Sequence, residues 1–174
     1  MRQCRERPTE DHLKARFSAL PIALAIVTIG CLRPTVDLDA ERAALLRTID
    51  AETGDLLAAD TAALRAELPE GDTVYNITGG QISRTTHANA LEGYDFSTVR
   101  YTAATILDSR IVHLSPDGRM AWIATRYRFT YARKNAAGAT QQSEMIDAAL
   151  AVYEKKGSRW VGAVLAQTFR PEMH

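Results

Sequence analysis

The last third of the chain alternates between apolar and polar positions and breaks at tight turns. Apolar residues at every second position, many of them β-branched, are typical of strands. The pattern predicts long strands over about 97–114, 119–133, 141–154 and 159–169. Consecutive strands with short connections pair antiparallel. This part of the sequence therefore predicts a meander of about four long antiparallel strands.

The segment before the meander has the period of an amphipathic helix. From Leu38 onward, Leu45, Ile49 and Leu56 fall on one stripe, and Asp37 or Asp39 can cap the first turn. Such a helix buries its apolar stripe against a neighbouring layer. We therefore expect it to cover one face of the sheet.

Shorter elements follow this helix. A second helix starts after Asp60 and ends at Pro69, and a short strand covers 72–78. Gly79-Gly80 turns the chain, and a third short helix is predicted from Arg84 to Leu91. Helices first and strands afterwards indicate an α+β fold, with N-terminal helices packed on an antiparallel sheet.

The first 36 residues differ from the domain at 37–174. A basic head precedes an uncharged run from Phe17 to Leu32, which Pro21 interrupts. The run is shorter than the roughly 20 residues that a membrane-spanning helix needs, which favours an export signal. The protein is therefore expected in the cell envelope or outside the cell. An N-terminal helix packed on the domain is the alternative.

The end of this segment, Thr28-Ile29-Gly30-Cys31, resembles the lipobox of bacterial lipoproteins. The resemblance implies that Cys31 carries a lipid and tethers the mature chain to a membrane. A plain signal or anchor without lipid is the alternative. Both cysteines, Cys4 and Cys31, lie in this segment, so no disulfide is expected in the domain.

The charge balance and the spacing of possible metal ligands exclude several classes of function. The chain has 21 basic and 21 acidic residues and no long run of one sign, so no nucleic-acid partner is expected. His87 and His113 are isolated, and neither a paired ligand spacing nor a phosphate loop occurs. We expect no metal site and no cofactor.

The stretch TQQSEMIDAALAVYEKKGSRWVGAVLAQTF closes the domain and resembles the nuclear transport factor 2-like superfamily. The likeness is sharpest at the charged turn with Gly157, Arg159 and Trp160, and covers about residues 37–170. Members include SnoaL-like polyketide cyclases, ketosteroid isomerases, scytalone dehydratase and the association domain of calcium/calmodulin-dependent kinase. The resemblance implies a cone of curved sheet around a cavity, which serves catalysis, ligand capture or oligomerisation.

Asp147 is the first candidate for a functional residue, because it interrupts an apolar strand. A lone buried carboxylate needs a cation or water, which Arg126 or Arg128 of the neighbouring strand could supply, and we expect Asp147 inside the cone near Arg126. As a catalytic residue it would be a general base, with Arg126 or Tyr75 positioning a carbonyl group. A structural ion pair, or an Asp on the solvated face, is the alternative.

The other candidates are weaker. Tyr75 and Tyr94 either line the mouth of the cone or cover its core. His87, four residues after Ser83, resembles half of a nucleophile pair and is the second catalytic candidate. Trp160 opens the last strand beside a turn, which predicts a packing role.

Three functions stay open at this point. The apolar last strand favours a domain that binds a small, largely apolar molecule without catalysis. The alternatives are an isomerase, cyclase or dehydratase that uses Asp147, and an interaction module that dimerises through an exposed sheet face. A homodimer is expected. A deep cavity containing Asp147 would favour the enzyme, a cavity with few polar groups the binding domain, and a filled cone the module.

Overall fold

The computed structural model describes residues 36–92, 94–135 and 137–171. The predicted export signal and Cys31 lie outside these residues. Within the described ranges, no helix combines the length and the apolarity that crossing a bilayer requires.

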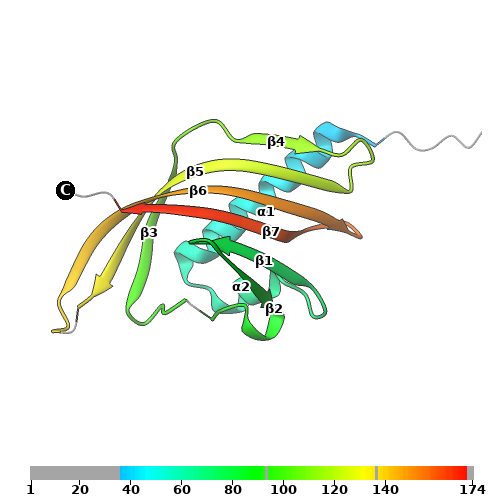
Figure 1. Cartoon of the computed structure of the whole chain (residues 1–174). Coiled ribbons are helices and arrows are strands. Elements are labelled where there is room, and N and C mark those ends of the chain that lie inside the picture. Colours follow the sequence, from blue (N-terminus) through cyan, green and yellow to red (C-terminus); the bar gives the residue numbers. More distant parts are fainter. Residues whose placement is uncertain (1–35, 93, 136, 172–174) are drawn as a thin grey trace, which may run out of the picture. The chain divides into compact units, whose positions relative to one another are not determined.

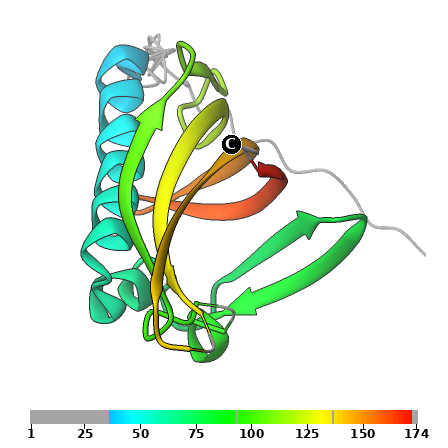
Figure 2. The ribbon, with the colours of Figure 1, turned by 90° about the vertical axis from the view of Figure 1, so that its left-hand side faces the viewer.

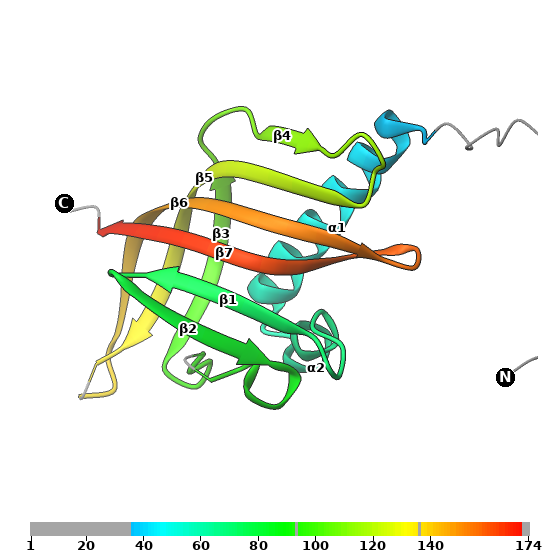
Figure 3. The same cartoon turned by 45° about the vertical axis from the view of Figure 1, so that its right-hand side comes forward.

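The helices precede most of the sheet, as predicted (Figure 1). They are α1 (Leu38–Ala58), α2 (Thr61–Ala66) and the short 3-10 helix η1 (His87–Asn89). The strands are β1 (Thr73–Thr78), β2 (Gln81–Thr86), β3 (Val99–Ile106), β4 (Ile111–Leu114), β5 (Met120–Lys134), β6 (Thr140–Lys156) and β7 (Arg159–Pro171). The sheet order is β2-β1-β7-β6-β5-β3, with β4 also paired to β5 (Figure 3).

The α+β class is confirmed, but the strand count needs correction. The sheet has seven strands. The predicted strand at 97–114 is interrupted, because β3 pairs with the second half of β5 and β4 with the first half. The sheet is also mixed, because β1 runs parallel to β7 whereas the other pairs are antiparallel.

The predicted helix from Arg84 to Leu91 is wrong. Gly79 and Gly80 have φ angles of 58° and 77°, which a two-residue hairpin turn of type I′ requires. This turn pairs residues 81–86 with β1, so the polar residues there continue a hairpin. Only His87–Asn89 is helical.

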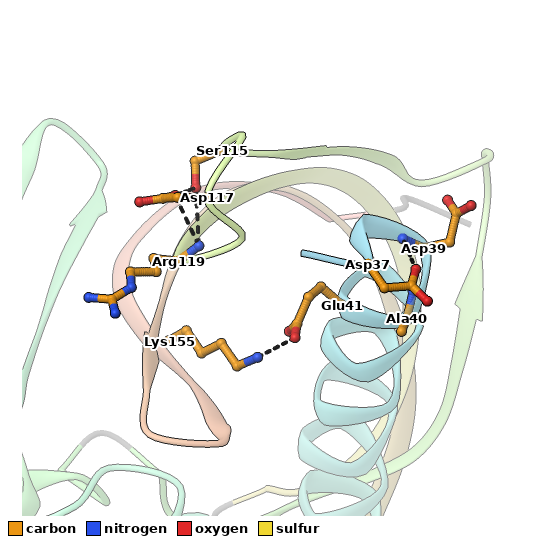
Figure 4. Close-up of polar contacts among 8 residues, drawn as sticks. All are labelled: Asp37, Asp39, Ala40, Glu41, Ser115, Asp117, Arg119 and Lys155. Atoms are coloured by element: carbon orange, nitrogen blue, oxygen red, sulfur yellow. Dashed lines mark hydrogen bonds and ion pairs between the residues drawn. The ribbon is translucent and has the colours of Figure 1, made fainter. Parts of the chain in front are cut away.

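The start of α1 is fixed at its cap and against the sheet (Figure 4). Asp37 Oδ1 accepts hydrogen bonds from the backbone N–H groups of Asp39 and Ala40, at 3.1 and 3.0 Å. One turn on, the Glu41 carboxylate pairs with the Lys155 ammonium group of β6. The predicted cap is confirmed, and the ion pair joins helix to sheet.

The turn between β4 and β5 is held by its own side chains, as Figure 4 shows. Ser115 Oγ accepts from the Met120 N–H at 3.0 Å and donates to Asp117 Oδ1 at 2.5 Å. Gly118 has φ 64°, and an added Cβ would lie 2.6 Å from Val36 Cγ1. The turn therefore requires glycine, because both the backbone angle and the space exclude a side chain.

The hydrophobic core lies between α1 and one part of the sheet. Its buried members come from both layers: Leu45, Ile49, Leu114, Ala121, Ile123, Tyr153 and Trp160. Leu45 and Ile49 lie on the predicted apolar stripe of α1, and Trp160 is 4% exposed. The packing role predicted for Trp160 is confirmed.

The sheet curves strongly, with α1 along one side (Figure 2). Residues of β5 alternate between the two faces: Ile123, Tyr127 and Phe129 are buried, whereas Trp122 and Arg126 are exposed. We call these the inner face and the outer face of the sheet. The inner face meets the helices and forms the cone that the resemblance implied.

Candidate functional site

A cavity of about 500 Å³ lies against the inner face of the sheet. Helices α1 and α2, the segment around Glu92 and Tyr94, and strands β1, β2, β3, β5, β6 and β7 contribute to its wall. The polar side chains of the wall are Glu52, Glu67, Asn76, Ser83, Thr85, Glu92, Tyr94, Tyr101, Asp147, Tyr153 and Gln167. The cone is therefore hollow, and its lining is rich in carboxyl and hydroxyl groups.

Asp147 lies in this wall and is 4% exposed. It is paired in register with Tyr127 of β5 and Phe169 of β7, which share its face. Its Oδ2 accepts a hydrogen bond from Gln167 Nε2 at 3.1 Å, while its buried Oδ1 has no partner. Burial raises the pKa of Asp147 to about 6, and the Gln167 hydrogen bond opposes that shift.

The expected contact between Asp147 and Arg126 is wrong. The register pairs Arg126 with Ala148, so Arg126 lies on the outer face. There its Nε bonds Asp108 Oδ2 at 2.5 Å. A shift of one residue moves a side chain to the opposite face of a sheet, and the sequence did not determine the register to that accuracy.

Two further carboxyl groups meet at the helical end of the cavity. Tyr153 Oη donates to Glu52 Oε2 at 2.7 Å, and burial raises the pKa of Glu52 to about 7. Burial and the charges of Glu52 and Asp55 raise the pKa of Glu67 to about 8. Glu67 Oε1 is buried without a hydrogen-bond partner.

Neither glutamate was predicted as a functional residue, although the position of Glu52 in the sequence indicated one. Glu52 falls on the apolar stripe of α1, three residues after Ile49 and four before Leu56. A carboxylate on a buried helix face is a candidate for a functional group. Glu67 follows α2 and gave no such signal, because only the packing of the helix end brings it to the cavity.

Aromatic rings form much of the remaining wall: Tyr94, Tyr101, Phe129, Tyr153 and Phe169. Tyr101 meets Phe129 edge to face, with 5.7 Å between ring centroids. Burial raises the pKa of Tyr94, and nearby Tyr101 and Glu67 add to the effect. Of the two positions left open for Tyr94, the structure has it in the cavity wall, and its contact with a ligand stays a prediction.

Comparison with solved structures identifies the architecture. A ketosteroid isomerase-like protein from Erwinia carotovora atroseptica is 19% identical, with a TM-score of 0.56 over 74% of this chain and 95% of that one. A protein from Cytophaga hutchinsonii described as NTF2-like is 12% identical, with a TM-score of 0.54 over 73% and 96%. The association domain of CaMKII from C. elegans is 15% identical, with a TM-score of 0.50 over 75% and 96%. The domain has the nuclear transport factor 2-like fold.

No protein-family model and no curated protein sequence matches this chain. At identities below 20% the three structural matches establish the nuclear transport factor 2-like fold alone. The chemistry of the cone therefore depends on its own side chains.

Tyr75 does not line the cavity. In register with Val164 of β7, it lies on the outer face and is 49% exposed. The expectation that it positions a ligand inside the cone is wrong. Successive residues of a strand point to opposite faces, and in β1 it is Asn76, not Tyr75, that lines the cavity.

His87 and Ser83 are not brought together as a catalytic pair. His87 Nδ1 lies 2.7 Å from the Leu68 carbonyl oxygen, a contact that anchors η1 to the chain that follows α2. Ser83 is in the cavity wall, whereas His87 is not among the residues that line it. The geometry gives His87 a structural contact with the Leu68 carbonyl group, and only Ser83 of the two lines the cavity.

No cluster of three or more metal-ligating side chains occurs within the ranges that the structure describes.

The outer face of this fold carries exposed apolar side chains across five strands. One row follows the register from Ile77 through Ala166, Leu150 and Ala124 to Ile111. We define the outer apolar face by its large exposed members: Tyr75, Ile77, Ile82, Ile111, Met120, Trp122 and Leu150. Contiguous apolar surface of this kind marks an interaction site more often than an ordinary surface.

Proposed function

We propose that the cone cavity binds a small organic molecule and that Asp147 acts on it as a general base. The observation that carries the proposal is the buried Oδ1 of Asp147, which lacks a partner in the wall of a cavity of about 500 Å³. The carboxyl and hydroxyl groups of the wall favour the enzyme hypothesis over a purely apolar binding domain. Asp147, and not His87, is the catalytic residue of this proposal.

The pKa values of the carboxyl groups suit proton transfer at neutral pH. With a pKa of about 6, Asp147 is ionised at pH 7 and is a stronger base than an ordinary Asp. With a pKa of about 8, to which a hydrogen bond with Asp55 contributes, Glu67 keeps its proton at pH 7, and a ligand oxygen would take that hydrogen bond in place of Asp55. Both residues line the same cavity, and carboxyl groups of one site whose pKa values differ can divide the roles of base and acid.

Such a pair suits removal of a proton from carbon beside a carbonyl group. Asp147 would take the proton, and the bonding electrons would move toward the carbonyl oxygen, which the Glu67 proton stabilises. Return of the proton to another carbon completes an isomerisation, and loss of a leaving group completes a dehydration. The likeness to a ketosteroid isomerase-like protein supports this reaction class by fold only.

Asp147→Asn is expected to abolish this chemistry and leave the fold intact. The Asn side chain preserves the shape and can still accept from Gln167, but it cannot take a proton. Loss of a general base lowers a rate by about 10²- to 10⁴-fold. Native mass spectrometry of the purified protein would identify a retained ligand, and its uptake of deuterium in D2O would measure proton exchange.

Asp108→Asn is the matched control, because Asp108 is an exposed aspartate on the outer side, paired with Arg126. It should leave ligand exchange unchanged. Equal exchange in wild type and Asp147→Asn would contradict the assignment of the base.

We propose in addition that a second copy of the chain covers the outer apolar face. Leu150 lies centrally in it, so Leu150→Asp would place a charge in the interface and is expected to convert a dimer into a monomer. Analytical ultracentrifugation measures the change. Ala51→Asp, on the exposed side of α1, is the control and should stay dimeric. A wild-type protein that is monomeric at all concentrations would refute the dimer.

Export of the chain stays a prediction, since it depends on residues 1–36. The expected product in the membrane fraction begins at Cys31 and carries a lipid mass, which intact-mass measurement detects. Cleavage at another position would exclude only the lipid. Soluble protein that keeps Met1 would exclude the export signal.

A further inference from the structure

We infer that the molecule taken up by the cone cavity is an organic cation with a protonated amine, held between carboxyl groups and aromatic rings. This inference rests on the proposed function and names the class of its ligand.

The ionisable groups of the cavity wall include acids but no bases, among the described residues. Its carboxyl side chains are Glu52, Glu67, Glu92 and Asp147, and no Lys, Arg or His occurs among the described residues that line it. Arg110 approaches the inner face, but its guanidinium group bonds Asp50 at 2.6 Å and Tyr127 Oη at 2.8 Å. Within the described part of the chain, no basic side chain therefore compensates the carboxylates of the wall that are ionised at neutral pH, and a ligand cation can do so.

Two buried oxygen atoms lack the donors that they need. A carboxylate accepts about four hydrogen bonds, yet Asp147 receives one from an amide, and its Oδ1 has none. Glu67, the protonated acid of the proposed function, also has a buried oxygen without a partner, its Oε1. A buried carboxylate without donors or a counter-charge is costly, and a ligand ammonium group supplies both.

The rings of the wall favour the same ligand. Aromatic faces attract ammonium groups through the ring quadrupole, most strongly where water is excluded. Tyr94, Tyr101 and Phe169 lie in the wall together with the carboxyl groups. A neutral ligand of the same shape could stack on the rings and donate a hydrogen bond, but it would bring neither a counter-charge nor the ammonium–ring attraction.

Binding of a cation must also change the protonation of the wall. The titratable groups that face one another are Glu52 and Asp55 of α1, Glu67 after α2, Glu92 and Tyr94 of the following segment, Tyr101 of β3, and Asp147 and Tyr153 of β6. A positive ligand favours the ionised form of Glu52, whose pKa lies near 7, so protons leave the protein when it binds, while the Glu67 proton of the proposed mechanism stays in place. A neutral ligand lacks this effect.

Calorimetric titration with benzylamine, benzyl alcohol and benzoate tests the inference on the full chain. These probes share size and ring and differ in charge. Benzylamine is expected to bind at least about tenfold more tightly than benzyl alcohol, which is the effect of one charge-assisted hydrogen bond. Its apparent binding heat should change between two buffers of different ionisation enthalpy, which reports proton release.

Asp147→Asn should remove most of the preference for benzylamine, whereas Asp108→Asn should retain it. Equal or tighter binding of benzyl alcohol or benzoate, or no binding of benzylamine, would overturn the inference. If Asp147→Asn stops deuterium exchange of the retained ligand while no amine preference exists, the general base stands and the ligand class is wrong. If the preference exists and exchange is unaffected, the ligand class stands and the general base is wrong.

Discussion

Replacing Trp160 with Ala is expected to lower the free energy of unfolding by about 3 to 5 kcal/mol. The indole is 4% exposed and belongs to the cluster in which α1 meets the sheet. Its removal leaves a cavity that neighbours such as Leu45 and Ile123 cannot fill without moving the helix. Denaturant unfolding followed by circular dichroism measures the loss.

The chain offers a matched control in its other tryptophan. Trp122 is 38% exposed on the outer face, so Trp122→Ala should cost under about 1 kcal/mol in dilute solution. If the loss of unfolding free energy in Trp122→Ala increases with protein concentration, the concentration-dependent part reports a weakened dimer. Equal losses for both variants would show that burial does not separate the two side chains.

The stability of the domain is expected to fall as the pH rises from about 5 to 8. The pKa values of Asp147, Glu52 and Glu67 are raised to about 6, 7 and 8, from 3.8, 4.5 and 4.5. In this range the folded protein holds protons that the unfolded chain has already lost. Stability from these groups is therefore complete below pH 4 and is lost as each folded-state pKa is passed.

Thermal unfolding across this pH range, at constant ionic strength, measures the fall. Asp147→Asn should remove its first part, up to about pH 6, and Glu67→Gln its last part, up to about pH 8. Asp108→Asn should leave the profile unchanged, because that carboxylate is exposed and paired with Arg126. Stability that rises steadily over this range would contradict the raised pKa values.

The local pattern of the sequence was enough to predict much of the fold, but it could not predict which distant strands pair. The stripe of α1, its Asp37 cap and the three long C-terminal strands are set by neighbours in sequence, and the structure has them within a few residues. The hairpin of β1 and β2 was half missed, because polar residues such as Arg84 fit a helix as well as an edge strand. The parallel pairing of β1 with β7 joins segments nearly 90 residues apart, which no local signal encodes.

The candidate site divides in the same way. The inward position of Asp147 followed from its apolar surroundings, and the side of the sheet on which Arg126 lies depended on the register with a neighbouring strand. Glu52 was accessible through helix periodicity. Glu67 depended on how α2 docks, which is a tertiary fact.

Tyr153 belongs at once to the hydrophobic core and to the wall of the cavity, where it holds Glu52. A substitution of Tyr153 would therefore affect both the stability of the fold and the chemistry of the cone. A lineage of this protein could change its ligand readily at Tyr94 or Phe169, which lie in the wall outside the core cluster. At the Tyr153 end, a new ligand would first require a new core.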